Sequence, residues 1–316
     1  MSFDQSVVQS VGVLIAMILL ATGLRGWGVL KEEYGGIFAR LITQYTLPAL
    51  IFTSLSSSHF DLRKVWLAVV MIVSQVICAL LAWSVGFLLK LSRPQKGALI
   101  LASTFSSSAF LGYAVVKGVY VNDHLALSDA AIVSELGVAT VIFTLGILIA
   151  IRFGTKETSL EERRCEVIKF FRSPIFCALI LGILCSFFPI PRSNFFVESV
   201  YKFLHIIGSA NTLLVTLTLG VMLHFEHIKK VLPVVLLACL IKLIVQPLLS
   251  SFQANLLNFP TLWHQIVVLE AAMPTAAMTA IFSKRYGCDS ELTTILIFAT
   301  FVSSVLTVIM MVFLLG

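Results

Sequence analysis

Long apolar runs, separated by short charged stretches, recur from one end of the 316-residue chain to the other. A helix that crosses a bilayer needs about 20 apolar residues, because the hydrocarbon core holds no water to bond an open backbone. In this chain 59% of the residues are hydrophobic and 12% are charged, whereas a soluble domain is about 25% charged. The pattern predicts an all-α, multi-pass integral membrane protein of the plasma (inner) membrane.

Ten such spans can be placed, and the connections between them are too short for a soluble catalytic domain. A hydrophilic stretch at 152–173 separates two sets of five spans. We therefore expect residues 1–151 and 174–316 to form two five-helix repeats with opposite orientations, joined by a cytoplasmic linker. The expected spans are 7–24, 37–55, 65–89, 97–116 and 127–151, followed by 174–190, 203–224, 231–257, 263–283 and 292–315.

The basic residues collect on one side of this ten-span arrangement. Sixteen of the 22 Lys and Arg residues fall there, five fall on the other side, and Lys242 lies inside the eighth span. Because cytoplasmic loops are enriched in Lys and Arg, both termini are predicted to be extracytoplasmic. The same loops account for the net charge of +6, so no nucleic-acid partner is expected.

The fourth span is rich in small and polar residues. It contains Ser103, Thr104, Ser106, Ser107 and Ser108 within two helical turns. Where a helix is broken, such hydroxyls can coordinate an ion or an anionic group. They also occur in helix-packing seams, bonded to carbonyls of their own helix.

The ninth span is also rich in small residues, and it contains Pro274. Proline lacks a backbone donor and clashes with the carbonyl four residues before it, so the helix should kink or unwind over 270–273. A proline in the middle of a span can also be a simple kink. The fourth and ninth spans together form the first hypothesis for a binding site.

Ionisable residues within the spans are few. Glu135, Lys242 and Glu270 lie deepest, and each such residue costs at least about 2.5 kcal/mol at the bilayer centre. A buried lysine with a carboxylate partner could lock two helices together or serve as a proton or substrate-charge site. Asp129 and His264 lie closer to span ends, and we expect them at the membrane interface.

Several function classes have no support from residues. The chain contains no nucleophile elbow, zinc-protease motif or phosphate-binding loop, so an enzyme is not expected. The six cysteines match no zinc or redox spacing. We therefore expect no metal site and no cofactor other than a coupling ion, H⁺ or Na⁺.

Short motifs resemble those of a known family, and they occur in the same order along almost the whole chain. The chain resembles the auxin efflux carrier family, which is related to the bile acid/sodium symporters and whose bacterial members include malonate transporters. The motifs are Thr46-Leu-Pro-Ala-Leu-Ile-Phe52, Phe110-Leu-Gly112, Thr218-Leu-Gly-Val-Met-Leu223, Lys242-Leu-Ile-Val-Gln-Pro247, Ala272-Met-Pro-Thr-Ala-Ala277 and Tyr286-Gly-Cys-Asp289.

The resemblance implies ten helices in two inverted repeats, with broken fourth and ninth helices that cross near the middle of the bilayer. It also implies a substrate site at the crossing, and a homodimer. Ser107 and Ala114 stand where relatives often have Asn and Pro, which predicts a less sharply broken fourth helix. The motifs assign to the site Ser106, Ser107, Ser108 and Gly112 from one helix and Met273, Pro274, Thr275 and Ala276 from the other.

Together these features predict a secondary transporter that moves a small organic anion, a carboxylate, through the lipid bilayer by alternating access. Glu135, Lys242 and Glu270 are candidates for proton or ion coupling, and Pro48 and Asn211 for lining the cavity. The alternative is a membrane-embedded sensor or binding module that has the carrier fold without net transport.

Overall fold

Helices joined by turns make up the described part of the computed structural model. Within that part, strand-type pairing is limited to one isolated antiparallel bridge, between Ser106 and Thr275. The structure describes residues 3–31, 33–57, 61–121, 123–155, 168–169, 171–187, 195–222 and 231–315.

Six helical segments of the described chain are long and apolar enough to cross a membrane. Two shorter apolar helices, Ser108–Val119 and Pro174–Phe187, lie between them in the sequence. The prediction of an all-α, multi-pass membrane protein is therefore confirmed. The six segments are Val8–Gly26, Leu62–Leu88, His124–Phe153, Phe195–Val221, Leu232–Leu256 and Ser290–Met311.

Contacts between residues divide the chain into two compact units, each assembled from three segments. This division cuts across the repeats expected at 1–151 and 174–316, and those repeats stay a prediction. Most of the linker expected at 152–173 lies outside the described residues. The first unit comprises Met1–Lys64, Ala109–Ala131 and Phe170–Leu223, and the second comprises Val65–Ser108, Ile132–Lys169 and His224–Gly316.

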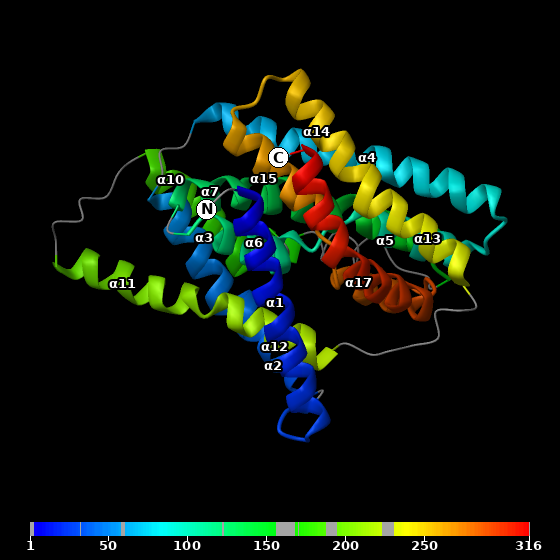
Figure 1. Ribbon diagram of the computed structural model, residues 1–316, viewed down its shortest axis with the longest axis horizontal. Helices are drawn as coiled ribbons and strands as arrows, with labels where there is room; N and C mark the ends of the chain where they lie inside the picture. The colour runs from blue at the N-terminus through cyan, green and yellow to red at the C-terminus, as the bar shows by residue number, and fades with distance from the viewer. Residues whose placement is uncertain are drawn as a thin grey trace. The chain divides into compact units, whose positions relative to one another are not determined.

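In the first unit, α1 lies beside α12, and α12 lies beside α2 (Figure 1). α11 starts eight residues before the span expected at 203–224, because the exposed Glu198 and Lys202 can continue a helix beyond the hydrocarbon. The helices of this unit are α1 (Phe3–Gly26), α2 (Tyr34–Leu41), η1 (Ile42–Thr46), α3 (Leu47–Ser56), η2 (Leu62–Lys64), α6 (Tyr113–Val119), α7 (His124–Ala131), α10 (Pro174–Phe187), α11 (Phe195–Ser209) and α12 (Asn211–Met222).

The contact between α1 and α12 depends on Gly220. A Cβ added there would lie 2.4 Å from the Cβ of Ala21 and 2.7 Å from the carbonyl oxygen of Ile18. Small residues permit such close backbone approach between membrane helices. Arg25 of α1 adds a hydrogen bond of 2.8 Å from Nη1 to the carbonyl of Val221, near the end of α12.

Gly220→Ala is therefore expected to destabilise the protein by about 1–3 kcal/mol, because the added methyl group forces α1 and α12 apart. Thermal unfolding of the purified protein in detergent measures this loss. Gly23→Ala in α1 is the matched control, since nothing lies within 4 Å of the added Cβ at that position. Equal unfolding temperatures for the two variants would contradict the proposed close packing.

Asp129 is buried in the first unit and paired with a lysine, while its predicted depth at the membrane interface stays a prediction. Its side chain is 1% exposed and lies 2.7 Å from the Nζ atom of Lys64, which is 7% exposed. The sequence places both residues near span ends, where interfacial positions are common. Packing of α3 against α7 covers this region.

The second unit contains the helices that flank both of the small-residue spans. Its members are α4 (Val65–Leu88), α5 (Arg93–Thr104), η4 (Ile132–Ala139), η5 (Ile142–Gly146), α8 (Ile147–Phe153), α13 (Leu232–Leu240), η7 (Ile241–Val245), α14 (Gln246–Leu256), α15 (Thr261–Ala272), α16 (Met278–Tyr286) and α17 (Ser290–Leu315). Segment η3 (Ser108–Gly112) begins in this unit and continues into the first.

Local sequence signals explain where several of these helices begin and end. Ser92 and Gln95 form a capping box at the start of α5, in which each side chain bonds the other's backbone N–H. Asp289 accepts a bond from the N–H of Leu292 at the start of α17. Gly287 ends α16 in the left-handed conformation, with φ 82°, which glycine adopts without steric strain.

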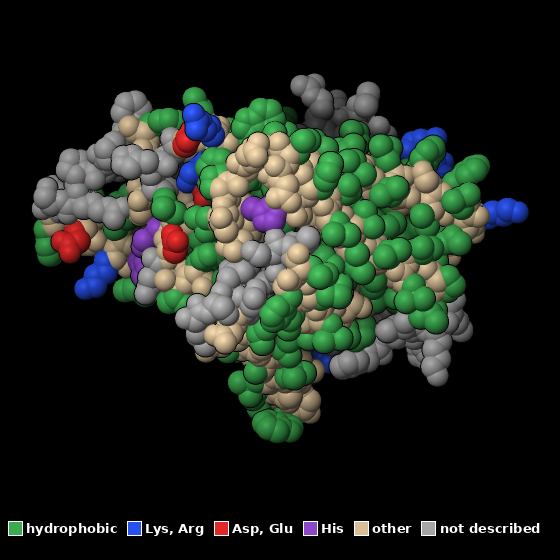
Figure 2. Space-filling model, turned by 45° about the horizontal axis from the view of Figure 1, so that its top comes forward, with side chains coloured by type: hydrophobic (Ala, Val, Ile, Leu, Met, Phe, Trp, Pro, Cys, Tyr) green, Lys and Arg blue, Asp and Glu red, His purple; other side chains and the backbone are tan. Residues whose placement is uncertain are grey.

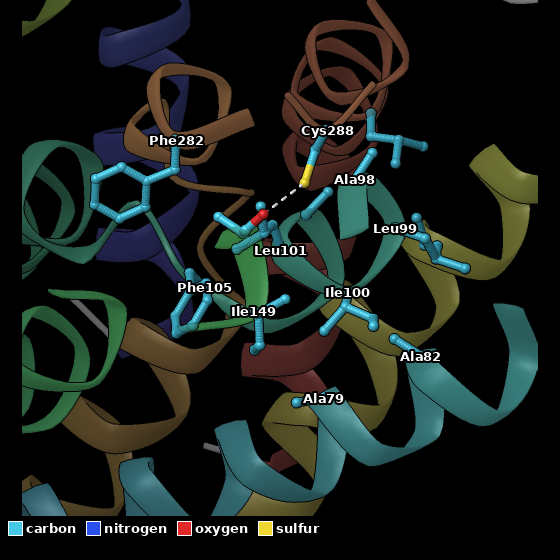
Figure 3. Packing of buried hydrophobic residues seen from close by; sticks show 14 of the residues in the cluster. Ala79, Ala82, Ala98, Leu99, Ile100, Leu101, Phe105, Ile149, Phe282 and Cys288 are labelled. Carbon is cyan, nitrogen blue, oxygen red and sulfur yellow. Dashed lines mark hydrogen bonds between the residues drawn. The ribbon is translucent and has the colours of Figure 1, made fainter. Parts of the chain in front are cut away.

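The hydrophobic core of the second unit packs around α5 (Figure 3). Leu99 and Ile100 of α5 lie near Ala79 and Ala82 of α4. At the far end of this cluster the Cys288 thiol donates to the carbonyl of Ala150 over 3.4 Å. Burial raises the pKa of the Cys288 thiol to about 11, which keeps its proton available for this bond.

Large apolar side chains are exposed on many helices, as expected for surfaces that face lipid. Phe195, Leu88 and Leu306 are more than 70% exposed. The face in Figure 2 is covered largely by hydrophobic side chains, with few charged ones. This surface agrees with a membrane location.

Candidate functional site

The fourth span is interrupted in its middle. α5 ends at Thr104, and Phe105 is extended, with φ −101° and ψ 124°. The chain becomes helical again at Ser108, where η3 begins. The fourth span is therefore broken although it lacks a proline, and a break less sharp than in relatives stays a prediction.

The ninth span is interrupted at a matching place. α15 continues through Ala272, and Met273 is extended, with φ −62° and ψ 147°; helix resumes at Met278. The break thus begins later than the predicted 270–273. Pro274 disfavours the helical conformation of Met273, the residue before it. The backbone N–H groups of residues 270–272 can still donate to the carbonyls four residues earlier, so the helix continues to Ala272.

The two extended segments pair with each other inside the second unit. The N–H of Ser107 donates to the carbonyl of Pro274 over 2.7 Å, and the N–H of Ala276 donates to the carbonyl of Phe105 over 2.9 Å. Each segment thereby bonds backbone groups that the break in the other segment leaves free. Such groups need a partner within the protein, because the hydrocarbon holds no water. This mutual pairing explains a complete break in the fourth span without a proline. We call the paired residues 105–107 and 274–276 the crossing.

Thr275 ties the crossing to two more helices. Its Oγ1 donates to the carbonyl of Ala102 in α5 over 2.6 Å. Its N–H donates to Oγ1 of Thr300 in α17 over 3.2 Å. Thr275 is 3% exposed, so these bonds form away from solvent.

Serine hydroxyls surround the crossing. Ser103 and Ser106 are at most 2% exposed, and neither Oγ atom has a hydrogen-bond partner in the described structure. Oγ of Ser108 lies 2.9 Å from Oγ of Ser134, and Ser134 donates to Oε1 of Glu135 over 3.1 Å. Ser106 therefore offers a free hydroxyl, while Ser108 connects the crossing to a buried carboxyl group.

The three deep ionisable residues are all buried within the second unit. Glu270 is 0% exposed, and neither carboxyl oxygen has a hydrogen-bond partner among the described residues. Glu135 is 1% exposed and close enough to Glu270 to interact electrostatically. Lys242 donates to the carbonyl of Ala271 over 2.8 Å. No carboxylate in the described chain lies within ion-pair distance of Lys242.

Three of the predicted site residues belong to the first unit. Pro48 follows the π-helical segment η1 and stands in the first turn of α3. Asn211 begins α12, and its Oδ1 accepts a bond of 3.0 Å from Thr46. Its Nδ2 has no partner in the described structure, and the residue is 1% exposed. Gly112 ends η3. Their roles as binding or lining residues stay predictions.

Sequence reasoning missed Gln246 and Thr300 as neighbours of the crossing, and Gln75 as a buried donor on α4. Gln246 donates to the carbonyl of Thr104 over 3.2 Å, and Gln75 donates to the carbonyls of Met71 and Gly137. A glutamine in an otherwise apolar span was the available signal. Among the described residues, no group of three or more His, Cys, Asp or Glu side chains could hold a metal ion.

Comparison with known proteins decides the family. Residues 6–311 match the family described as membrane transport protein. The chain belongs to this family, which is that of the auxin efflux carriers. An uncharacterized transporter of Methanocaldococcus jannaschii is 30% identical over 303 residues, which cover 94% of this chain and 95% of the relative. An uncharacterized transporter of Methanothermobacter thermautotrophicus is 26% identical over 298 residues, which cover 93% of each protein.

Membership of the auxin efflux carrier family confirms the resemblance based on colinear motifs. The family consists of membrane transporters, so the function of this chain is transport across a membrane. In this auxin efflux carrier family member, the crossing joins the two spans that the motifs single out.

Proposed function

We propose that the chain is a secondary transporter for a small organic anion, a carboxylate, which binds at the crossing. The buried, unpartnered hydroxyl of Ser106 is the observation that carries this proposal. Directly after the crossing, η3 begins at Ser108 and α16 begins at Met278. Helix N-termini present free N–H groups and a positive dipole end, which favour an anion.

Alternating access would require two bodies that move against each other. The division into two compact units supports this mechanism, since both segments of the crossing belong to the second unit. The first unit includes the first, second, sixth and seventh expected spans. We propose ten spans in two inverted repeats, with both termini extracytoplasmic in the inner membrane and a homodimer as the assembly.

Coupling to a proton is the proposed role of Glu135 and Glu270. A hydroxyl chain from Ser108 through Ser134 to Glu135 supports it, since this chain leads from the crossing to a buried carboxyl group. Sodium is the other candidate ion. A proton-coupled transporter accumulates substrate in response to an imposed pH gradient without sodium, and a sodium-coupled one does not.

Ser106→Ala is expected to weaken binding of malonate, the probe, by about tenfold, which corresponds to about 1.4 kcal/mol. The free energy of unfolding should stay within about 0.5 kcal/mol, because the hydroxyl has no partner to lose. Isothermal titration and thermal unfolding of the purified protein provide the two values. Ser304→Ala is the control, since Ser304 is buried but bonds only the Phe301 carbonyl of its own helix. Unchanged malonate binding would remove Ser106 from the site.

A ligand screen by thermal shift tests the substrate class. Dicarboxylates, aromatic acids, bile-acid-like amphiphiles, lipids and sterols are compared at two pH values, with and without sodium. A specific ligand at 100 times its Kd adds about 2.7 kcal/mol of stability. Stabilisation by one carboxylate class, followed by its uptake into proteoliposomes, supports the transporter. Stabilisation by lipids or sterols alone, without flux of any carboxylate, identifies the sensor alternative.

A further inference from the structure

Each broken span leaves a half-helix whose C-terminal carbonyls lack a partner in their own helix. No water is available in the hydrocarbon to bond them, so other donors of the protein must do so. At the end of α5, the carbonyl of Thr104 accepts a bond of 3.2 Å from Nε2 of Gln246. At the end of α15, the carbonyl of Ala271 accepts a bond of 2.8 Å from Nζ of Lys242.

Both donors come from one helical segment, Leu232–Leu256, which consists of α13, η7 and α14. Lys242 and Gln246 are four residues apart, so their side chains lie on the same side of this segment, about one turn from each other. Each is 0% exposed. One helix thus contacts the C-terminal ends of both half-helices.

The chemistry of each donor suits the end that it contacts. The last carbonyls of a helix carry partial negative charge, which a cation or an amide donor stabilises. A buried lysine is costly unless it is paired, yet no carboxylate in the described chain is within ion-pair distance of Lys242. Its described partner is the half-helix carbonyl, which gives the buried ammonium group a structural purpose.

We propose that Lys242 and Gln246 are positioning residues that cap the two half-helices and so keep the crossing formed. Lys242 holds the end of α15, and Gln246 holds the end of α5. Neither needs to touch the substrate. The inference deepens the proposed function, because the crossing is the proposed substrate site, but the caps can be tested without any substrate.

Hydrogen exchange of the purified full-length protein in detergent micelles is the test. Lys242→Met and Gln246→Met remove each donor and leave an apolar side chain of comparable length. Lys242→Met is expected to speed exchange about tenfold at the end of α15 and its extended continuation, residues 269–276. Gln246→Met is expected to do the same at 101–107. Each variant should change the opposite end less.

Ser250→Ala is the matched control. Ser250 lies one turn beyond Gln246 on α14, is 0% exposed, and bonds Oγ of Ser74 over 3.0 Å. The Ser250→Ala variant loses a buried hydrogen bond on the same helix, and that bond does not involve the end of either half-helix. Exchange at 101–107 and 269–276 should remain at the wild-type rate in this variant.

The end-specific pattern separates capping from a general loss of stability. Wild-type exchange in both Met variants overturns the proposal, and so does equal acceleration of both ends by each variant. If a Met variant fails to fold, Gln246→Leu replaces it, since leucine also lacks the amide donor that faces the Thr104 carbonyl. Faster exchange confined to 101–107 supports capping, and unchanged exchange overturns it. Malonate binding is measured in a separate experiment. If malonate does not bind, the hydrogen-exchange result still tests the capping proposal.

Discussion

Asp129→Leu is expected to destabilise the protein by about 3–5 kcal/mol, the loss typical of breaking a buried ion pair by removing one partner. The substitution takes away the carboxylate that lies 2.7 Å from Nζ of Lys64, and that ammonium group is only 7% exposed. An uncompensated buried charge is the physical reason for the loss. Equilibrium unfolding of the purified protein in mixed micelles measures it.

The double variant Lys64→Met/Asp129→Leu is expected to recover most of this stability, because it removes both charges and leaves apolar side chains. The pair between Lys31 and Glu33 is the exposed control, since its side chains are 65% and 70% exposed with an N–O distance of 3.8 Å. Lys31→Met should change stability by less than about 1 kcal/mol. If the double variant is as unstable as Asp129→Leu, loss of packing and not of charge pairing explains the effect.

Thr275→Val is expected to lower stability by about 1–3 kcal/mol, because the Ala102 carbonyl then loses its bond from Oγ1 in a buried place. Valine keeps the shape of threonine. Loosening of the crossing should also reduce malonate uptake into proteoliposomes by about tenfold, as expected for a site whose geometry has shifted. Thermal unfolding and initial uptake rates, normalised to reconstituted protein, give the two values.

Thr216→Val is the matched control for that substitution. Thr216 is 0% exposed, as buried as Thr275, but its Oγ1 bonds the carbonyls of Thr212 and Leu213 in its own helix. Those carbonyls lie within α12, where backbone N–H groups can bond them, so little should be lost. Equal effects of the two substitutions would show that Oγ1 of Thr275 does not hold the crossing.

Much of the candidate site could be predicted from local sequence. A run of serines marked the fourth span, and alanines around Pro274 marked the ninth. The family motifs then selected Ser106, Pro274 and Thr275. Helix interruption depends largely on residue type and on neighbours in the chain, such as the residue before a proline. Capping signals such as Ser92 and Gln95 are local for the same reason.

Other features could not be predicted because they depend on partners distant in the sequence. Gln246 contacts a carbonyl 142 residues away, and Lys64 pairs with Asp129 across two segments of the first unit. The ammonium group of Lys242 bonds the Ala271 carbonyl, 29 residues away, which no local pattern indicates. Which side chain reaches an unpaired backbone group depends on how helices pack, and hydrophobic patterns do not specify that packing.

Local sequence is enough to predict a multi-pass, all-α membrane protein, because apolar length and charge spacing define helices in a bilayer. Colinear motifs are enough to predict the auxin efflux carrier family. Local sequence also indicates which two spans break. How the breaks are sealed is visible only in the folded protein, where 105–107 pair with 274–276 and where Lys242 and Gln246 bond the half-helix ends. A backbone group freed within the membrane must find a donor or acceptor, and the packing of distant helices decides which group that partner is.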